Sequence, residues 1–230
     1  MAFVFLDIDD TLLDFHKAEA LALSRAISEM GVEPQPELLS RYSEINRQQW
    51  ELLENGLLTR DQVLLRRFEL LFAEKGLSLS APDLRDRYEG HLAEGHFFMP
   101  GAPELLEALY GRHRLFIVSN GSAVVQAGRI ASAGIARYFE QIYISEQIGY
   151  EKPTPAFFDR CFACIPDFER EKAIIVGDSL TSDIRGGRNA EIKSCWYNPR
   201  GQQPRDDIQA DCEIRTLSEL PALLEDLFPQ

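Results

Sequence analysis

Cysteine is scarce in this chain, and its few cysteines form no regular pattern. Four occur among 230 residues, enough for two disulfides or one zinc site. Cys161 and Cys164 are spaced as in redox or zinc motifs, but they fall in an apolar helical stretch without the glycine or proline of a metal knuckle. Cys195 and Cys212 fall in or beside expected strands. We therefore expect buried, reduced thiols.

A long hydrophobic run is also missing. The apolar stretch at residues 3–6 leads directly into Asp7, so it is too short for the core of a signal peptide. No run approaches the roughly 20 apolar residues that a membrane-spanning helix needs. We expect a cytoplasmic protein with no membrane partner.

Positive charge is in deficit. The chain has 24 lysines and arginines against 37 aspartates and glutamates, which gives a net charge of −13. Nucleic-acid polymers are normally bound by a clustered Lys/Arg surface that releases counterions, so we expect no DNA or RNA partner. An acidic protein can still bind a small phosphorylated metabolite when a metal ion and a few local cations offset its charge. Such a metabolite is the expected partner.

What the chain does contain is an alternation of strands and helices. With 45% hydrophobic and 27% charged residues, it has the composition of a folded globular protein. Helical patterns separate the later apolar runs, and this alternation predicts an α/β fold with a Rossmann-like parallel sheet. The strands of such a sheet are buried on both faces, so they read as continuous apolar runs. We expect strands at residues 2–6, 115–118, 141–144, 173–176 and 194–197.

Proline, threonine and glycine mark the ends of the later helices. Pro103 and Pro155 suit first-turn positions, and Gly134 suits a C-terminal stop. Thr154 can cap the helix that runs through Phe158. These signals place helices between the strands, as a parallel sheet requires.

The first and second expected strands are separated by about 100 residues without a convincing strand, which is too long for a simple crossover. We predict an inserted all-helical domain at residues 15–99, and a core domain built from residues 1–14 and 100–230. Thr59 and Gln62 form a capping box at the start of one inserted helix. The four helices are expected at residues 16–30, 37–53, 61–75 and 82–93, with Gly31, Gly56 and Gly76 as punctuation.

The first expected strand ends in the motif Asp7-Ile8-Asp9-Asp10-Thr11. Its spacing places the carboxylates of Asp7 and Asp9 two residues apart at the carboxyl edge of a parallel sheet, where open α/β folds bind their ligands. A solvated acidic turn after a strand is the alternative. The apolar run directly before the motif favours the functional interpretation.

A second acidic segment, residues 177–183, follows the strand at 173–176. Carboxylate oxygens, with waters and a substrate phosphate, make up the octahedron that Mg²⁺ prefers, so we predict Mg²⁺ as the cofactor. For Asp10 and Asp183, the alternative is a role as caps at the protein surface. The predicted metal residues are Asp7, Asp178 and the backbone carbonyl of Asp9 as direct ligands, with Asp183 acting through a bound water.

Two further segments follow expected strands. Ser119, Asn120 and Gly121 offer a hydroxyl, an amide and flexible backbone that can bind phosphate oxygens near a helix N-terminus. Lys152 precedes a proline and a helix, where it could bridge the nucleophile and a transferring phosphoryl group. Taken alone, the first is a common turn and the second a loop. Their order with the two acidic segments favours a shared site.

These four segments, in this order and over the whole chain, resemble those of the haloacid dehalogenase (HAD) superfamily. The resemblance implies a phosphatase fold with a helical cap of the C1 type after the first motif, closing over small substrates. It also implies roles for the residues of the four segments: Asp7 as nucleophile, Asp9 as general acid and base, Ser119 as phosphate-binding hydroxyl, Lys152 as stabilising cation, and Asp178 with Asp183 as metal-handling pair.

An aspartate at position 9 favours phosphate chemistry over dehalogenation, because the founding dehalogenases lack it and halide needs no proton on leaving. The resemblance therefore implies that Asp7 attacks phosphorus while Asp9 protonates the leaving alkoxide. Asp9 then activates the water that hydrolyses the acyl phosphate. We predict a magnesium-dependent phosphoric monoester hydrolase.

Part of the expected cap resembles the YjjG-like pyrimidine 5′-nucleotidase branch. The segments are residues 46–50, 56–59 and 67–68. Asn46 and Trp50 are four residues apart on one helix face, where they could reach a base or sugar, and Arg67 completes the predicted substrate set. A core-packing tryptophan beside a satisfied asparagine is the alternative. A nucleoside 5′-monophosphate is the substrate that we favour.

Other activities fit the same core motifs. A sugar-phosphate phosphatase, an acylneuraminate-9-phosphate phosphatase and a β-phosphoglucomutase-like transferase each share them. A binding protein without catalysis would normally lose Asp7, Asp9 or the acidic pair, and all of these are present. The sequence leaves oligomeric state and regulation open.

Overall fold

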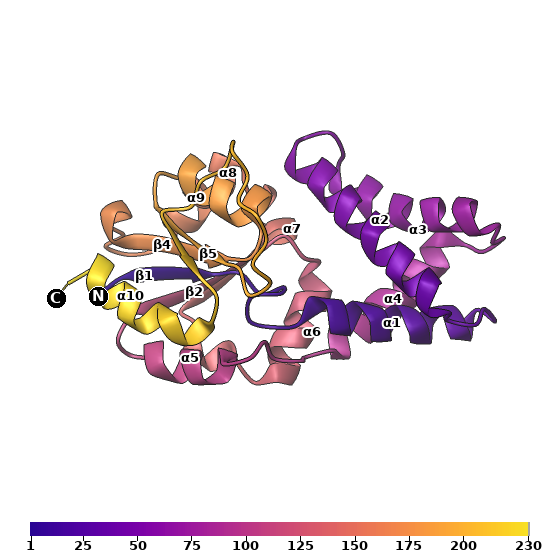
Figure 1. The fold of residues 1–230 in the computed structure, drawn as a ribbon, viewed down its shortest axis with the longest axis horizontal. Coiled ribbons are helices and arrows are strands. Elements are labelled where there is room, and N and C mark those ends of the chain that lie inside the picture. Colours follow the sequence, from indigo (N-terminus) through magenta and orange to yellow (C-terminus); the bar gives the residue numbers. More distant parts are fainter. Residues whose placement is uncertain (230) are drawn as a thin grey trace.

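The computed structural model describes residues 1–229 and contains a six-stranded parallel sheet (Figure 1). Its order is β3-β2-β1-β4-β5-β6, so β1 lies in the middle and Val4 pairs with Leu115 on one side and Ile174 on the other. This is the parallel α/β architecture that the sequence predicts. The strands are β1 (Phe3–Leu6), β2 (Arg114–Ser119), β3 (Gln141–Ile144), β4 (Ala173–Gly177), β5 (Lys193–Tyr197) and β6 (Cys212–Ile214).

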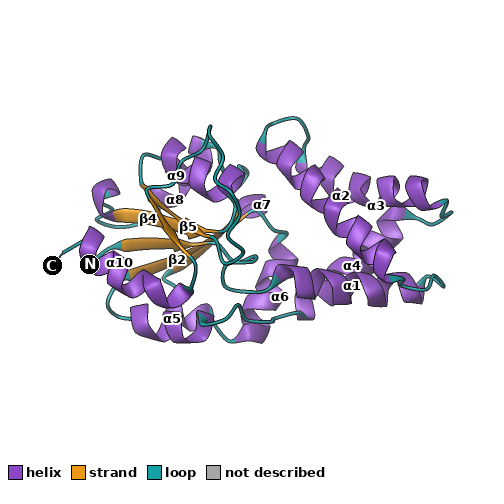
Figure 2. Ribbon diagram, in the orientation of Figure 1, coloured by secondary structure: helices purple, strands orange, loops and turns teal. Residues whose placement is uncertain are grey.

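Helices cover both faces of the sheet (Figure 2). Side chains alternate along β1: Val4 and Leu6 pack in one buried cluster with α5 (Ala102–Leu109) and α10 (Leu220–Leu227). Phe3 and Phe5 pack in another with α8 (Pro155–Phe162). Burial on both faces explains why these strands are continuously apolar. The remaining helices of this part are α6 (Ala123–Ala133), α7 (Ser145–Ile148) and α9 (Arg185–Asn189).

Most of the expected elements are confirmed, with two corrections in this region. The sequence did not predict β6, because it is three residues long and its central residue, Glu213, is exposed. Thr154 does occupy the position before α8, but its hydroxyl donates to the Glu151 carbonyl at 2.5 Å and does not cap the helix. Gly134 ends α6 in the left-handed conformation, with φ +69°, as expected.

All four cysteines are free thiols, so the expectation of reduced cysteines is confirmed. Cys161 and Cys195 are buried, Cys212 is only partly buried and Cys164 is exposed, so the expected burial holds for two of the four. Cys164 follows the C-terminus of α8, where the chain turns toward the surface. Cys195 and Cys212 pair across β5 and β6.

A second, all-helical region separates β1 from β2 in the chain. Its helices share a hydrophobic cluster of their own, which includes Tyr42, Phe68 and Tyr88. We keep the predicted division, with residues 15–99 as a cap domain, as a proposal that this separate cluster supports. Thr59 and Gln62 form the expected capping box. The four helices are α1 (Phe15–Glu29), α2 (Pro36–Glu54), α3 (Arg60–Lys75) and α4 (Ala81–Glu94).

The two chain segments that join the regions lie together. The Asp14 amide donates to the Phe97 carbonyl at 2.7 Å, and Leu13 pairs with Phe98 in an antiparallel bridge. Helix α6 packs directly against α4, where a Cβ on Gly128 would lie 2.8 Å from the carbonyl oxygen of Ala93, so this close approach requires glycine. Within residues 1–229, no helix is both long and apolar enough to cross a membrane.

Candidate active site

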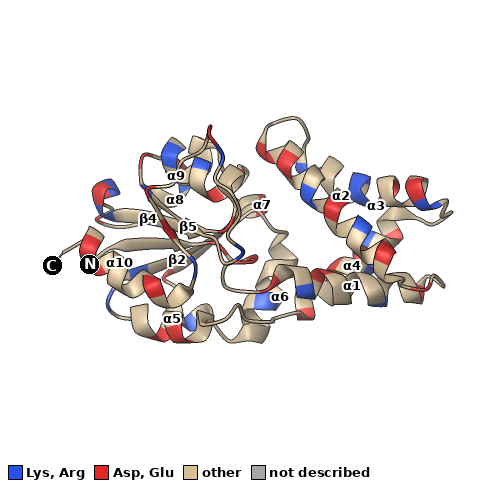
Figure 3. Cartoon of the chain, in the orientation of Figure 1, with Lys and Arg blue, Asp and Glu red and all other residues tan. Residues whose placement is uncertain are grey.

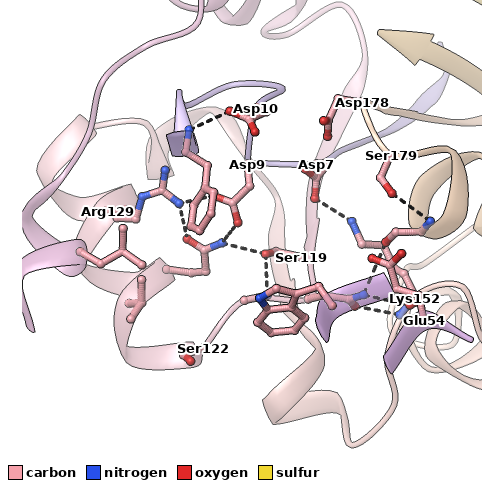
Figure 4. Close-up of a pocket in the computed structure, with 18 of the residues that line it drawn as sticks. Asp7, Asp9, Asp10, Glu54, Ser119, Ser122, Arg129, Lys152, Asp178 and Ser179 are labelled. Atoms are coloured by element: carbon pink, nitrogen blue, oxygen red, sulfur yellow. Dashed lines mark hydrogen bonds and ion pairs between the residues drawn. The ribbon is translucent and has the colours of Figure 1, made fainter. Parts of the chain in front are cut away.

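The carboxyl edge of the sheet and the helical region enclose a cavity of about 180 Å³. On the core side, the cavity is lined by residues at or after the ends of β1, β2 and β4, at the edge where open α/β folds bind ligands. On the side of the helical region, the cavity is lined by residues of α2, α3 and α4. Side chains on both regions therefore face one space, and Figure 4 shows its central groups.

Lys152 is the cation at the centre of the site. Its Nζ donates to Asp7 Oδ1 and Asp183 Oδ1, both at 2.7 Å, and to the Val118 carbonyl at 2.8 Å. Burial acts against its charge, but Asp183 and Asp7 outweigh that effect and raise the pKa of Lys152. The lysine therefore stays charged where a phosphoryl group would meet Asp7.

Asp7, Asp178 and Asp183 converge, with one carboxylate oxygen of each lying within 4.8 Å of the others. Burial raises the pKa of Asp7 to about 8, Lys152 opposes this, and Asp183 adds to it. Burial and the neighbouring carboxylates raise the pKa of Asp178 well above its usual range. This crowding leaves negative charge that one lysine cannot balance.

A hard divalent cation fits this donor set, because Mg²⁺ binds a few carboxylate oxygens and completes its octahedron with water or phosphate. Gly177 allows the Asp183 side chain to lie close against the end of β4. A Cβ at that position would overlap the Asp183 side chain. The three acidic residues of the prediction are thus brought together, while the Asp9 carboxylate is turned elsewhere.

The Ser119–Gly121 loop is fixed to the lysine loop by a reciprocal pair of hydrogen bonds. Asn120 Nδ2 donates to the Lys152 carbonyl at 2.9 Å, and the Lys152 amide donates to Asn120 Oδ1 at 2.8 Å. The Gly121 amide donates to Ser119 Oγ at 3.0 Å. All three loop residues line the cavity next to Asp7, as a phosphate-binding loop requires.

Asp9 points away from Asp7, toward α6 (Figure 4). Its Oδ1 is ion-paired with Arg129, and its Oδ2 accepts a hydrogen bond from Gln126 Nε2 at 2.7 Å. Gln126 Nε2 also donates to Ser119 Oγ at 2.8 Å. We did not predict Gln126 or Arg129 from the sequence. The available signal was the one charged residue in the apolar helix at 123–133.

Of the three predicted substrate residues in the helical region, Trp50 and Arg67 line the cavity. Asn46 is 2% exposed, and both ends of its amide are engaged: it donates to Glu19 at 2.7 Å and accepts from Arg67 at 3.1 Å. It therefore supports Arg67. It lines a second, neighbouring cavity, which Trp50 lines as well.

Two polar contacts that the sequence analysis missed bring the helical region onto the core. Arg60 Nη1 donates to the Asn120 carbonyl at 2.8 Å, and its other terminal nitrogen contacts Gly121. Glu54 accepts a hydrogen bond from Thr181 at 2.5 Å, and burial raises its pKa to about 7. Arg60 and Asn120 are 60 positions apart in the sequence, and Glu54 and Thr181 are 127 positions apart. No local sequence pattern reveals contacts over such separations.

Lysines and arginines are dispersed among acidic residues over both regions (Figure 3). The cations that face the cavity, Arg67, Arg129 and Lys152, come from three different elements and are buried. Local cations thus accompany the acidic groups of the site despite the net charge of −13.

Comparison with known proteins agrees with this geometry. A family model described as haloacid dehalogenase-like hydrolase matches residues 4–197. The chain belongs to this family. The matched residues begin in β1 and end with β5, so they include Asp7, Lys152 and the acidic pair.

Two of the named relatives are pyrimidine 5′-nucleotidases, the class of the predicted branch. Pyrimidine 5′-nucleotidase PynA of Streptococcus pneumoniae is 35% identical, with 95% of this chain and 92% of that protein covered. Pyrimidine 5′-nucleotidase YjjG of Escherichia coli is 31% identical, with 96% of each covered. The HAD-hydrolase YfnB of Bacillus subtilis, in a crystal structure bound to magnesium, has a TM-score of 0.93 at 37% identity over 97% of this chain and 98% of that one.

The predicted superfamily, branch and enzyme class are thereby confirmed. The chain is a HAD hydrolase with the parallel α/β core of that family, and its class is phosphoric monoester hydrolase. The sequence resemblance rested on four short segments, and the fold brings all four to one cavity. The substrate, the metal and the individual roles of the residues are taken up next.

Proposed function

We propose that this enzyme is a magnesium-dependent 5′-nucleotidase that hydrolyses nucleoside 5′-monophosphates, pyrimidine ones foremost, through a phosphoryl group carried on Asp7. The observation that carries the proposal is the contact of Lys152 Nζ with Asp7 Oδ1 at 2.7 Å inside the cavity. Trp50 and Arg67 line the same cavity from the helical region. The core side of the cavity suits phosphoryl transfer, and the side formed by the helical region suits a base.

In the first half-reaction, a carboxylate oxygen of Asp7 attacks phosphorus, and the bond from phosphorus to the nucleoside oxygen breaks. Lys152 and the Ser119–Gly121 loop hold the phosphoryl oxygens as charge shifts onto them. Asp9 gives its proton to the departing oxygen, so the nucleoside leaves as an alcohol. The product is an acyl phosphate on Asp7.

In the second half-reaction, the now ionised Asp9 takes a proton from water. The water oxygen attacks phosphorus, and the bond from phosphorus to the Asp7 oxygen breaks. Inorganic phosphate leaves, Asp7 regains its carboxylate, and Asp9 regains its proton. Protons and charges therefore balance over the cycle, with water as the second substrate.

Asp7 and Asp178 would hold Mg²⁺, with the Asp9 carbonyl as a further ligand and Asp183 acting through water. When bound, the ion supplies charge that offsets repulsion between Asp7 and a dianionic phosphate. The three converging carboxylates, whose burial raises the pKa values of Asp7 and Asp178, support this assignment. The magnesium-bound structure of YfnB supports it too.

The substrate assignment is supported by the side chains with which the helical region lines the cavity. Trp50 lines the cavity together with the apolar side chains Leu64, Leu92 and Val125, which offer a non-polar lining to a flat ring. Arg67 lies 3.6 Å from Glu89, and this pair offers both donors and an acceptor to the edge of a base. The names of PynA and YjjG point to the same substrate class.

A hydrolysis screen of purified protein with Mg²⁺ tests the proposal. Nucleoside 5′-monophosphates should give higher kcat/KM than hexose phosphates and acylneuraminate 9-phosphate. A sugar phosphate at least tenfold better than every nucleotide, roughly 1.4 kcal/mol of transition-state preference, would overturn the substrate assignment and leave the phosphatase mechanism standing. Transfer of phosphate to a sugar in place of water would indicate a transferase.

A further inference from the structure

The general acid and base is held by a helix on which none of the sequence motifs lies. Arg129 is 0% exposed on α6, and its Nη1 forms the ion pair with Asp9 Oδ1. Gln126, one turn earlier, donates to the other oxygen, Oδ2, at 2.7 Å. Arg129 Nη1 also donates to Gln126 Oε1 at 3.2 Å, so the two side chains hold each other as well as Asp9.

Arg129 is in turn anchored by the helical region. Its Nε donates to the carbonyl of Gly95 at 3.0 Å, where α4 has just ended. The guanidinium lies 5.7 Å from the ring centroid of Phe15, the first residue of α1. Both anchors therefore belong to the segments by which the chain leaves the core and returns to it.

In the described part of the chain, one buried donor of Arg129 is left without a partner, which packing alone does not explain. Burying an arginine is costly unless its charge is paired and its donors are satisfied. Here Nη2 is buried and, among the described residues, has no hydrogen-bond partner. A structural arginine would be expected to satisfy that donor. Arg129 also lines the catalytic cavity, beside Asp9 and Ser119.

We propose that Arg129, with Gln126, is a positioning residue that fixes the orientation of the Asp9 carboxylate for both half-reactions. The inference rests on the proposed acid and base role of Asp9. That role requires the carboxylate to meet the leaving oxygen and then the attacking water, and a misplacement of about 1 Å can cost about 100-fold in rate. Arg129 acts on the reaction only through Asp9.

A double-mutant cycle tests this, with p-nitrophenyl phosphate as the probe and Mg²⁺ present. Arg129→Met should lower kcat by about 10- to 100-fold, and KM should fall with it so that kcat/KM changes by less than about threefold, because slowed dephosphorylation lets the phosphorylated enzyme accumulate. In the Asp9→Asn background, the same substitution should change kcat by less than about threefold, because its target is already lost. Arg129→Lys, which keeps a donor and the charge, should restore part of the rate.

Phosphorylated protein gives a second readout. The probe has a good leaving group, so phosphorylation needs little help from Asp9 while dephosphorylation still needs it. Arg129→Met should therefore accumulate acyl phosphate after acid quench. Arg137→Met, which removes an exposed arginine from the core surface, is the matched control and should not.

The outcomes separate the inference from the function on which it rests. Equal losses from Arg129→Met in the wild-type and Asp9→Asn backgrounds, without acyl phosphate, would mean a structural role only and would overturn the inference. An Asp9→Asn enzyme as active as wild type would instead overturn the proposed role of Asp9. If Arg129→Met does not fold, as judged by circular dichroism, Arg129→Lys takes its place in the same cycle.

Discussion

The α/β core and the helical region line the same cavity, but they contribute to it in different ways. The core supplies its groups from the ends of neighbouring strands, so Asp7, Ser119 and Asp178 lie close together because of the sheet itself. The helical region supplies Trp50 and Arg67 from two helices, and Arg67 is held by Asn46. We infer that the sheet sets the reaction chemistry, while the shape of the cavity wall formed by the helical region depends on long-range packing.

This difference predicts how substitutions will behave. A change in the core should affect every phosphate ester alike, because all substrates share the phosphoryl group. A change in the helical wall should affect substrates according to their leaving groups. Of the three experiments that follow, the first two test this division and the third tests the crowded carboxylates of the core, in order from the largest expected effect to the smallest.

Removal of magnesium should abolish turnover of all substrates. Without a divalent cation, burial keeps Asp7 largely protonated at neutral pH, and the ionised form that attacks phosphorus would repel a dianionic phosphate, since the central lysine is shared with Asp183. Steady-state rates in EDTA and after readdition of Mg²⁺ measure this, and Asp178→Asn should imitate the chelator. Undiminished hydrolysis in EDTA would show that the carboxylate cluster does not serve a metal.

Substitution of Trp50 by alanine, or of Arg67 by methionine, should be selective. Stacking of one base on an aromatic ring is worth about 1–3 kcal/mol, so kcat/KM for uridine 5′-monophosphate should fall about 5- to 150-fold. Acetyl phosphate carries no ring, and its kcat/KM should change by less than about threefold.

Arg66→Met is the matched control for Arg67, because Arg66 is its exposed neighbour on α3. It should leave both substrates unaffected. If Trp50→Ala reduces hydrolysis of acetyl phosphate as much as that of the nucleotide, then the helical wall supports the chemistry itself and the division between the two regions fails.

The smallest effect concerns stability and the crowded carboxylates of the core. Because burial raises the pKa of Asp7 to about 8, the folded protein binds more protons than the unfolded chain between about pH 4 and pH 8. Stability of the metal-free protein should therefore fall as pH rises through this window, by up to about 1.4 kcal/mol per pH unit for one such group.

Thermal unfolding in EDTA between pH 6 and pH 8 measures this slope. Saturating Mg²⁺ should flatten it, because a cation bound to the ionised carboxylates stabilises the folded protein most at the higher pH. Asp7→Asn should make the slope smaller, and the raised pKa values of Asp178 and Glu54 account for the slope that is left. An identical slope in this variant would place the titrating group elsewhere.

Sequence alone predicted the core well for a physical reason. Parallel strands buried on both faces give apolar runs, and the residues that follow them must meet at one edge, so local motifs at positions 7, 119, 152 and 178 converge. The strand β6 escaped prediction because it is short and half-exposed, which leaves no apolar run to detect.

Contacts between distant elements could not be predicted in this way. Arg129 is 120 positions from Asp9, and Gln126 is 117 positions from it, so their pairing depends on how α6 packs against the sheet. The same holds for Asn46, which a helix-face argument placed near the substrate, while in the fold its amide is bound by Glu19 and Arg67.

The central claim, a phosphoryl group carried on Asp7, is tested most directly by trapping it. Asp9→Asn protein is mixed briefly with p-nitrophenyl phosphate and Mg²⁺, quenched in acid and examined by mass spectrometry. We predict one added phosphoryl group that maps to Asp7 and is released by hydroxylamine, as expected of an acyl phosphate, and none on Asp7→Asn protein. Label on any other residue, or wild-type turnover by both variants, would contradict the mechanism.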